Sequence, residues 1–249
     1  MSPTVVITGG SKGIGWELVK VFAKDGYKVI SGSRSVREDV PTDISKNIKQ
    51  VVIDVKNRED HLKLVKAAID WNGTLDCYIN NAGFSEWRSL PDIDNNFISE
   101  IFETNLFGYF WGAQAAETVL IEGGSIINIS SLAAKRGTPN NSAYSATKFG
   151  VTGLTQSLSK ELGPKGIRVN AVCPVLIQTP GLLDALGSKY SPASSDTNKF
   201  LANFALSQTA LGRLPTVNEV AQLCLFLASN NASGITGQSI NVDCGVLPN

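Results

Sequence analysis

The sequence predicts an α/β fold built on a doubly wound parallel sheet. Short apolar runs alternate with helix-length segments along all 249 residues, and this alternation is typical of parallel strands with helices on both faces. A glycine-rich turn follows the first apolar run directly, and apolar residues make up 43% of the chain. We therefore expect a single Rossmann-type domain over residues 1–249, with about seven strands joined by right-handed crossovers.

The first strand is expected at Thr4–Thr8, where an apolar run ends in two glycines. The segment after it, residues 14–23, has apolar side chains at helical spacing, and Gly26 is a plausible stop. Similar runs and stops define the rest of the chain. The other strands are expected at 28–32, 50–54, 75–80, 125–130, 168–173 and 239–242, and the other helices at 59–71, 97–120, 142–162 and 217–228.

Residues 182–204 depart from this alternation. The segment is rich in Ser, Asn, Ala and Lys, and we expect it to be a long irregular insertion. Such insertions in a compact domain are usually functional or mobile. We interpret it as a lid over the substrate, with a simple surface excursion as the alternative.

Composition excludes several classes of function. Basic and acidic residues both number 22, so no basic excess indicates a nucleic-acid or membrane-surface partner. The chain shows no signal-peptide pattern and no apolar run long enough to span a bilayer, so we expect a cytoplasmic location. Four unpaired cysteines and one histidine, His61, make a zinc site or a Ser-His-Asp hydrolase improbable, and no metal is expected.

A phosphate site is expected in the turn between the first strand and the first helix. Glycines let the backbone turn tightly and approach a ligand, and the free N–H groups of a helix start attract anions. The strand before and the helix after supply the context of a dinucleotide site. The residues predicted to contact the cofactor here are Gly9, Ser11, Lys12, Gly13, Ile14 and Gly15.

The end of the second strand indicates which dinucleotide binds. An acidic residue there would bond the ribose 2′-hydroxyl of NAD, but this chain has Ser33 and Arg34. Arg34 can pair with a 2′-phosphate, and Lys12 adds a second positive charge. Both cations favour NADP(H) as the cofactor. The alternative is that they are ordinary surface charges.

A candidate catalytic pair lies on the helix expected at 142–162. Tyr144 and Lys148 are four residues apart and share one helix face, and Ser131 lies thirteen residues before Tyr144. A cation beside a phenol is expected to lower the phenol pKa and to allow proton exchange with an alcohol or ketone near neutral pH. Taken alone, the pair could equally be a solvated helix pair.

These motifs together resemble the short-chain dehydrogenase/reductase family, in the 3-oxoacyl reductase-like branch of about 250 residues. The resemblance runs from Thr4 to Gly245. The four-residue spacing of Tyr144 and Lys148 disfavours the enoyl-reductase branch, where that spacing is wider. The matching motifs are Thr8-Gly9 with Gly13 and Gly15, Asp54-Val55, Asn80-Asn81-Ala82-Gly83, Asn105, Ser131, Tyr144, Lys148, the segments 170–174 and 177–179, Ile235 to Gln238, and Val242-Asp243.

The resemblance implies a hydride-transfer enzyme with Asn105, Ser131, Tyr144 and Lys148 as its catalytic tetrad. Tyr144 would give its proton to the developing alkoxide, and Lys148 would hold the nicotinamide ribose. Ser131 would bond the substrate oxygen, and Asn105 would position a water beside Lys148. Further cofactor contacts are implied for Asp54, Val55, Asn81, Ala82, Gly83, Pro174, Ile177 and Thr179.

Two departures from the family pattern affect substrate inference. Val175 stands where relatives usually have glycine, and its β-branched side chain is expected to narrow the nicotinamide pocket or to restrict the backbone. Glu122 lies before the fifth strand, where relatives that engage acyl carrier protein tend to carry a basic residue, so that partner is discounted. The residues expected to line the substrate pocket with Ser131 are Phe84, Trp87, Ala133, Leu176, Gln178 and Leu182, with Tyr190 added from the lid.

A mainly apolar pocket suits a small ketone, aldehyde or keto-ester. An NADP-dependent sugar or polyol dehydrogenase would use the same tetrad, and a dinucleotide-sensing protein without turnover is the alternative from another class. Relatives often form tetramers through two long helices, here 97–120 and 142–162, so a homotetramer or homodimer is expected.

Overall fold

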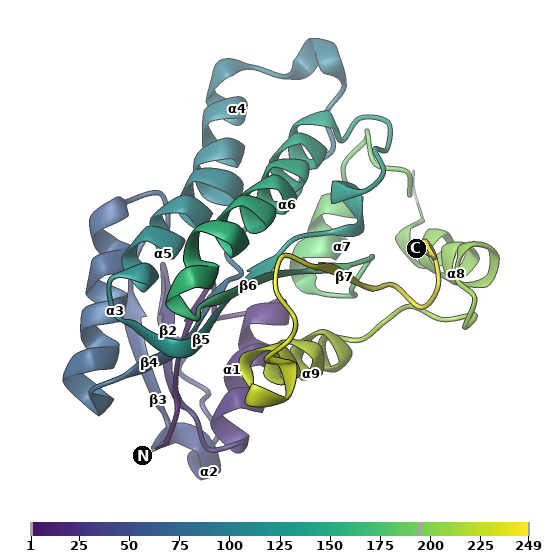
Figure 1. Ribbon diagram of the computed structural model, residues 1–249. Helices are drawn as coiled ribbons and strands as arrows, with labels where there is room; N and C mark the ends of the chain where they lie inside the picture. The colour runs from purple at the N-terminus through teal and green to yellow at the C-terminus, as the bar shows by residue number, and fades with distance from the viewer. Residues whose placement is uncertain (1, 194–195, 249) are drawn as a thin grey trace.

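A seven-stranded parallel sheet, in the order β3-β2-β1-β4-β5-β6-β7, forms the centre of the computed structural model, which describes residues 2–193 and 196–248 (Figure 1). The chain moves outward from β1 to β3 and then crosses to β4, so the strand order reverses beside β1. This confirms the doubly wound fold. The strands are β1 (Thr4–Thr8), β2 (Lys28–Ser33), β3 (Ile48–Val52), β4 (Leu75–Asn80), β5 (Leu120–Ile129), β6 (Arg168–Pro174) and β7 (Ser239–Val242).

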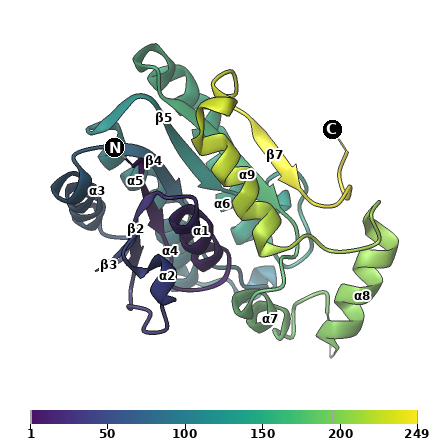
Figure 2. The same ribbon diagram turned by 90° about the horizontal axis from the view of Figure 1, so that it is seen from below.

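Helices cover both faces of the sheet. On one face α1 (Gly13–Lys24) and α9 (Val217–Ala228) lie side by side, and on the other lie α3 (Arg58–Asn72), α5 (Gly108–Glu117) and α6 (Ser142–Leu162) (Figures 1 and 2). Successive side chains of β1 point to opposite faces. Val5 and Ile7 therefore join the core under α1 and α9, while Val6 joins the core under α3 and α5.

The third strand begins two residues earlier than the sequence predicts. β3 spans Ile48–Val52 and pairs with Val29–Ser33 of β2, so Asp54 lies in the loop after the strand. β3 is an edge strand of the sheet. Edge strands tolerate polar side chains. Lys49 and Gln50 interrupt the apolar pattern, so the sequence does not indicate that the strand begins at Ile48.

The expected helix at 97–120 is interrupted. α4 (Asn95–Phe102) leads into a π-helical segment, Glu103–Phe107, which continues into α5 and ends at Glu117. Gly108 begins α5 where a Cβ would lie 3.0 Å from the Val55 carbonyl oxygen, so the helix passes close to the loop after β3. A π-helical turn shifts the helix face, and such turns are frequent at functional sites.

The segment 182–204 is not irregular, as the sequence suggested. It holds most of α7 (Pro180–Leu186) and the first part of α8 (Thr197–Gln208). Each helix is short and is started by a side-chain cap: Thr179 accepts from the Leu182 N–H, and Asp196 accepts from the Lys199 N–H. Ser194 and Ser195, in the middle of the expected lid, lie outside the described residues.

Smaller elements complete the description. They are α2 (Thr42–Ser45) and the 3-10 turns Leu90–Asp92, Leu132–Ala134, Gly163–Lys165 and Asn230–Ala232. Within the described residues, no helix has the length and apolar character needed to cross a membrane, and no cluster of metal-ligating side chains is found. The four cysteines are free thiols, and three of them, Cys77, Cys173 and Cys224, are buried.

Candidate active site

A cavity of about 640 Å³ lies at the carboxyl ends of the strands and takes in almost every predicted site residue. It extends from the glycine turn after β1 to the loops after β5 and β6. The predicted cofactor residues that line it are Gly9, Ser11, Lys12, Gly13, Ile14, Gly15, Ser33, Arg34, Asp54, Val55, Asn81, Ala82, Gly83, Tyr144, Lys148, Pro174, Ile177 and Thr179, and the predicted substrate residues that line it are Phe84, Trp87, Ser131, Ala133, Leu176 and Leu182.

The glycine turn is packed too tightly for side chains. A Cβ on Gly15 would lie 2.1 Å from the Gly9 carbonyl oxygen, and one on Gly9 would lie 2.9 Å from the Ala82 Cα. The Asn81 amide secures the turn by donating to the carbonyl oxygens of Thr8 (2.9 Å) and Gly9 (3.3 Å). No side chain caps the start of α1, so its first N–H groups are free for an anion. The turn therefore fits the phosphates of a dinucleotide.

Two exposed cations lie at this end of the cavity. Lys12 and Arg34 both line it, and no hydrogen bond or ion pair of their side chains occurs within residues 2–193 and 196–248. Arg37 behaves differently: it donates to the Ser11 carbonyl oxygen (3.0 Å), pairs with Asp39 (2.6 Å) and stacks on Trp16. The structure therefore separates an arginine used to hold the turn from two cations that remain available to a ligand.

Tyr144 and Lys148 project from α6 toward the end of β5. The Lys148 ammonium is 3% exposed and donates to the Ile129 carbonyl oxygen (2.8 Å) and the Tyr109 hydroxyl (3.3 Å). It lies 5.7 Å from the centre of the Tyr144 ring. Ser131 follows β5 and begins the 3-10 turn Leu132–Ala134, where its hydroxyl accepts from the Ala133 N–H (3.1 Å). The three side chains meet on one wall of the cavity.

The expected acidic phenol is not found in this structure. Burial raises the pKa of Tyr144, and the hydrogen bond with Ser131 opposes that rise only in part. Burial also lowers the pKa of Lys148 from 10.5 to about 7, so the ammonium is weakened as a neighbouring charge. Desolvation penalises both charged forms and outweighs their mutual attraction here. A protonated Tyr144 is the form that can act as an acid.

Asn105 lies in the π-helical segment and is fully buried, so it does not line the cavity. Its side chain accepts from the Phe84 N–H (3.0 Å) and donates to the Phe84 carbonyl oxygen (2.8 Å). The amide thus fixes the backbone after β4. Tyr109, one helical turn later, was not predicted. Its hydroxyl donates to the Ile129 carbonyl oxygen (2.8 Å) and accepts from Lys148, so it positions the lysine.

The segment after β6 closes the cavity opposite Tyr144. Val175 has ordinary backbone angles and is 7% exposed, whereas Leu176 has a φ of +37°. The left-handed conformation thus falls one residue after the position where relatives have glycine, and a leucine there stores backbone strain. Gln178 was expected to line the cavity, but it does not. Neighbouring side chains alternate along this segment, so Ile177 is buried and Gln178 is exposed.

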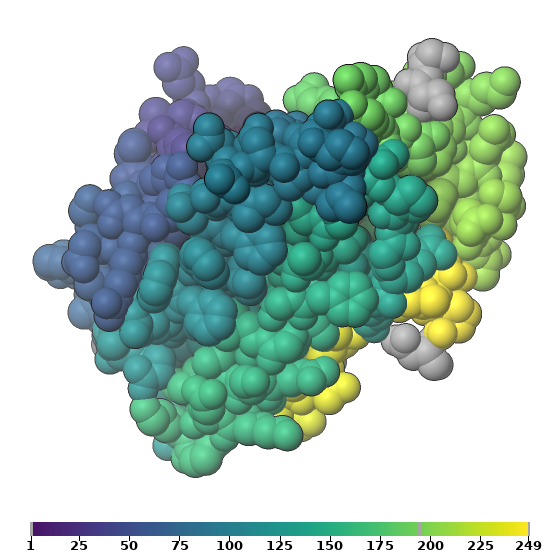
Figure 3. All heavy atoms as spheres, turned by 90° about the horizontal axis from the view of Figure 1, so that it is seen from above, coloured from purple at the N-terminus to yellow at the C-terminus, as the bar shows by residue number. Residues whose placement is uncertain are grey.

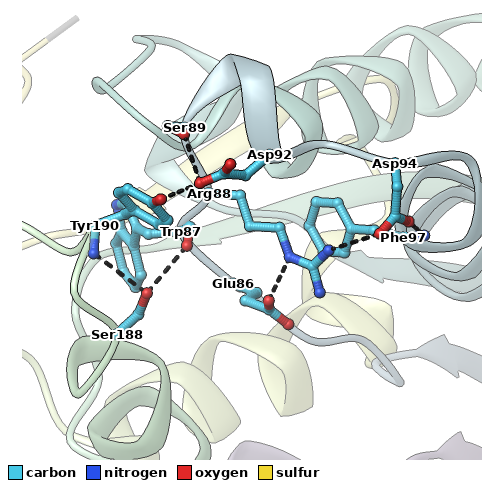
Figure 4. Close-up of polar contacts among 9 residues, drawn as sticks. All are labelled: Glu86, Trp87, Arg88, Ser89, Asp92, Asp94, Phe97, Ser188 and Tyr190. Atoms are coloured by element: carbon cyan, nitrogen blue, oxygen red, sulfur yellow. Dashed lines mark hydrogen bonds and ion pairs between the residues drawn. The ribbon is translucent and has the colours of Figure 1, made fainter.

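Hydrogen bonds join the lid segment to the loop after β4. The Ser188 hydroxyl donates to the Trp87 carbonyl oxygen (3.1 Å), and the Tyr190 hydroxyl bonds the Asp92 carboxylate (Figure 4). Tyr190 thus contacts the rim and does not line the cavity, contrary to expectation. From above, the blue-teal surface of the 84–102 region and the green surface of α7 and α8 share the upper side of the molecule (Figure 3).

The structure adds lining residues that sequence patterns did not reveal. Phe200 and Phe204 come from α8 and are four residues apart with their ring centres 6.1 Å from each other. Their spacing on one helix face was a signal that could have been read. Arg136, Thr138 and Asn141 come from the loop that follows Ser131, and no local pattern marks them as site residues.

Comparison with known proteins identifies relatives over the whole chain. The family model described as Enoyl-(Acyl carrier protein) reductase matches residues 9–247. A putative ketoacyl reductase of the monensin polyketide synthase from Streptomyces virginiae is 34% identical over 257 residues, with 100% of this chain and 98% of the relative covered. L-2,3-butanediol dehydrogenase from Corynebacterium glutamicum is 34% identical over 259 residues, with both chains covered completely (100%).

Solved structures of oxidoreductases also match nearly the whole chain. Ligand-free aldohexose dehydrogenase from Thermoplasma acidophilum superposes with a TM-score of 0.89 at 31% identity, covering 98% of this chain and 94% of that one. A variant actinorhodin polyketide ketoreductase with NADPH gives 0.87 at 28% identity, covering 98% and 97%. 3-Ketoacyl-(acyl-carrier-protein) reductase from Brucella melitensis with NADH gives 0.85 at 29% identity, covering 98% of each chain.

Proposed function

This chain belongs to the short-chain dehydrogenase/reductase family, and from that membership we propose that it is an NADP(H)-dependent oxidoreductase. It reduces the carbonyl group of a small ketone, aldehyde or keto-ester to an alcohol, in a reversible reaction. One observation carries the proposal: Ser131, Tyr144 and Lys148 meet at one end of a cavity whose other end holds a glycine turn and two unpaired cations.

In this proposal the bound nicotinamide supplies or accepts the hydride. The chain's own residues do the rest. Ser131 holds the carbonyl oxygen and stabilises the negative charge that grows on it. Tyr144 delivers the proton to that oxygen, and its raised pKa keeps it in the protonated form that reduction requires. Lys148 is fixed by Ile129 and Tyr109 and lies where it can hold a ribose.

Asn105 keeps its place in the proposed tetrad as the residue that positions a water beside Lys148. Its side-chain amide is engaged with the Phe84 backbone, so it also positions the substrate wall that follows β4. The segment 182–204 acts as a substrate lid in this proposal, and Ser188 and Tyr190 tie its first part to Trp87 and Asp92.

The preference for NADP(H) is supported by Lys12 and Arg34. Both cations line the cavity beside Ser33 and Ser35, and neither is neutralised by an acid in the described part of the chain. A 2′-phosphate would satisfy their charge, whereas the 2′-hydroxyl of NAD would not. One solved relative holds NADPH and another holds NADH, so the proposed preference of this chain depends on Lys12 and Arg34.

Assembly as a homotetramer is part of the proposal. Three phenylalanines on the π-helical segment, α5 and α6 are exposed by 40% or more: Phe107 by 43%, Phe110 by 45% and Phe149 by 48%. Exposed aromatic residues on neighbouring helices are typical of protein–protein interfaces. A second copy of the chain packing on the same helices would bury them symmetrically.

Tyr144→Phe is the decisive test. The variant should bind NADPH nearly as wild type does and lose turnover by at least about 100-fold, because the proton donor is removed and the ring is retained. Tyr27→Phe, at a buried tyrosine remote from the cavity, is the matched control and should keep its activity. Near wild-type turnover by Tyr144→Phe would refute the assignment.

Substrate screening separates the rival functions. NADPH and NADH consumption is measured with ketones, aldehydes, keto-esters and an enoyl thioester, and NADP⁺ reduction is measured with diols and aldohexoses. Oxidation of diols or sugars alone would favour a polyol dehydrogenase, the activity class of two relatives. Reduction of the enoyl thioester alone would favour the activity in the family model's description. Tight NADPH binding without turnover of any compound would indicate a dinucleotide sensor.

A further inference from the structure

Arg136 is a cation in the substrate half of the cavity. It lies in the loop after Ser131 and lines the cavity together with Ala133, Thr138 and Asn141. The loop backbone is held in place, because the Arg136 N–H donates to the Leu132 carbonyl oxygen (3.2 Å). The guanidinium is therefore carried by an ordered turn.

No acid of the described residues neutralises this guanidinium. No hydrogen bond or ion pair of the Arg136 side chain occurs in 2–193 or 196–248. Of the acids that line the cavity, Asp54 lies 3.9 Å from Lys56 at the dinucleotide end, and Glu100 is an exposed residue of α4. A cation in a half-enclosed site without a partner is an unsatisfied binding group.

The neighbouring cation shows what a structural role looks like in this loop. Lys135 is equally half-buried, but its ammonium donates to the Ser239 carbonyl oxygen on β7 (2.8 Å) and is used by the fold. The Arg136 side chain makes no such contact with any residue that the structure describes. The two adjacent side chains therefore divide into one that ties the loop to the sheet and one that remains available to a ligand.

The substrate end of the cavity is mixed in polarity. The lining includes the polar residues Ser131, Arg136 and Asn141 and the mainly apolar residues Trp87, Leu182, Phe200 and Phe204. A molecule that fits this lining has a hydrocarbon part and an anionic group. Arg136 follows Ser131 by five residues, and the 3-10 turn Leu132–Ala134 lies between them. An anionic group at Arg136 is therefore held by a different part of the loop from a carbonyl group at Ser131.

We propose that Arg136 is an anion subsite and that the substrate is an oxo acid whose carboxylate pairs with this guanidinium while its carbonyl lies at Ser131. This inference rests on the proposed carbonyl reduction and specifies its substrate class. The planar guanidinium matches a carboxylate in bidentate geometry. Arg136 thus decides which carbonyl compounds are used, and takes no part in proton or hydride transfer.

Matched acid and ester substrates test the subsite. NADPH consumption is measured with levulinate and methyl levulinate, and with acetoacetate and methyl acetoacetate, for wild type, Arg136→Gln, Arg136→Lys and the remote surface control Lys160→Gln. Wild type should prefer the acids, and added salt should reduce kcat/KM for the acids only. Arg136→Gln should lower kcat/KM for the acids by about 10- to 100-fold, chiefly through KM, and change the esters by less than about threefold.

The variants distinguish recognition from damage. Arg136→Lys should fall between wild type and Arg136→Gln, because it keeps the charge and loses the bidentate fork, and Lys160→Gln should match wild type. Equal losses on acid and ester would indicate a structural role and overturn the subsite. Wild-type turnover of esters with no preference for acids would also overturn it while leaving carbonyl reduction intact. No turnover of any of the four compounds would count against both the proposed function and this substrate class.

Discussion

Replacing Gly15 with alanine tests whether close packing of the glycine turn is needed for stability and for cofactor binding. The added Cβ would lie 2.1 Å from the Gly9 carbonyl oxygen and 2.5 Å from the Asn81 side-chain nitrogen. Carbon and oxygen atoms that are not bonded to each other stay about 3 Å or more apart, so the turn must move by roughly 1 Å. That movement also disturbs the Asn81 hydrogen bonds to Thr8 and Gly9.

The expected cost has two parts. Overpacking costs about 1–3 kcal/mol, and each of the two weakened hydrogen bonds costs about 1 kcal/mol, so we expect a loss of about 3–5 kcal/mol in the free energy of unfolding. For a chain of this length that corresponds to a fall in Tm of roughly 6–20 °C. A displacement of about 1 Å at a binding backbone should also weaken NADPH binding by about 100-fold.

Calorimetry and NADPH titration measure both effects. Gly234→Ala is the matched control, because Gly234 is exposed, its φ lies outside the left-handed region, and a Cβ there meets nothing within 4 Å. It should unfold at or slightly above the wild-type temperature and bind NADPH normally. If Gly15→Ala unfolded like wild type and bound NADPH within about twofold of wild type, the packing argument would be refuted.

Four further outcomes are expected. Arg34→Ser should weaken NADPH binding by about 10- to 100-fold and leave NADH binding unchanged, because the guanidinium pairs with the 2′-phosphate, which only NADPH carries. Equal losses of affinity for both dinucleotides in titrations would contradict this. Burial lowers the pKa of Lys148 to about 7, so above pH 7 the unfolded chain holds a proton that the folded chain lacks. In denaturant titrations, the stability of wild type relative to Lys148→Met should therefore rise by up to about 1 kcal/mol per pH unit from pH 7 to 9. Burial also lowers the pKa of His61, so wild type should lose stability relative to His61→Gln as pH falls from 7 to 5, and parallel curves would argue against a neutral buried histidine. Phe149→Glu should reduce the particle mass in light scattering at micromolar concentration, and a mass equal to wild type would exclude α6 from the interface.

Local chemistry made much of the site predictable from the sequence. The glycine turn needs its residues at fixed positions between a strand and a helix, and Tyr144 and Lys148 share a helix face by spacing alone. These requirements lie within a few residues of one another. All the predicted glycine-turn residues line one cavity, and local sequence patterns were enough to predict them.

Long-range packing decided the features that the sequence left hidden. Tyr109 meets Lys148 because α5 and α6 pack together, and Lys135 contacts β7 because the loop after Ser131 lies beside that strand. The tuning of Tyr144 depends on burial, which spacing does not report. The helices α7 and α8 were hidden because they are short and weakly amphipathic, so their caps carry more information than their apolar pattern.

Helix α6 has one face toward the cavity and another on the outer surface. Lys148 faces inward to the cavity, and the next residue, Phe149, is 48% exposed on the outer surface. In the proposed oligomer, subunit association would therefore act directly on the helix that carries Tyr144. Specific activity should consequently decline when the enzyme is diluted below the concentration at which subunits separate, and recover on reconcentration.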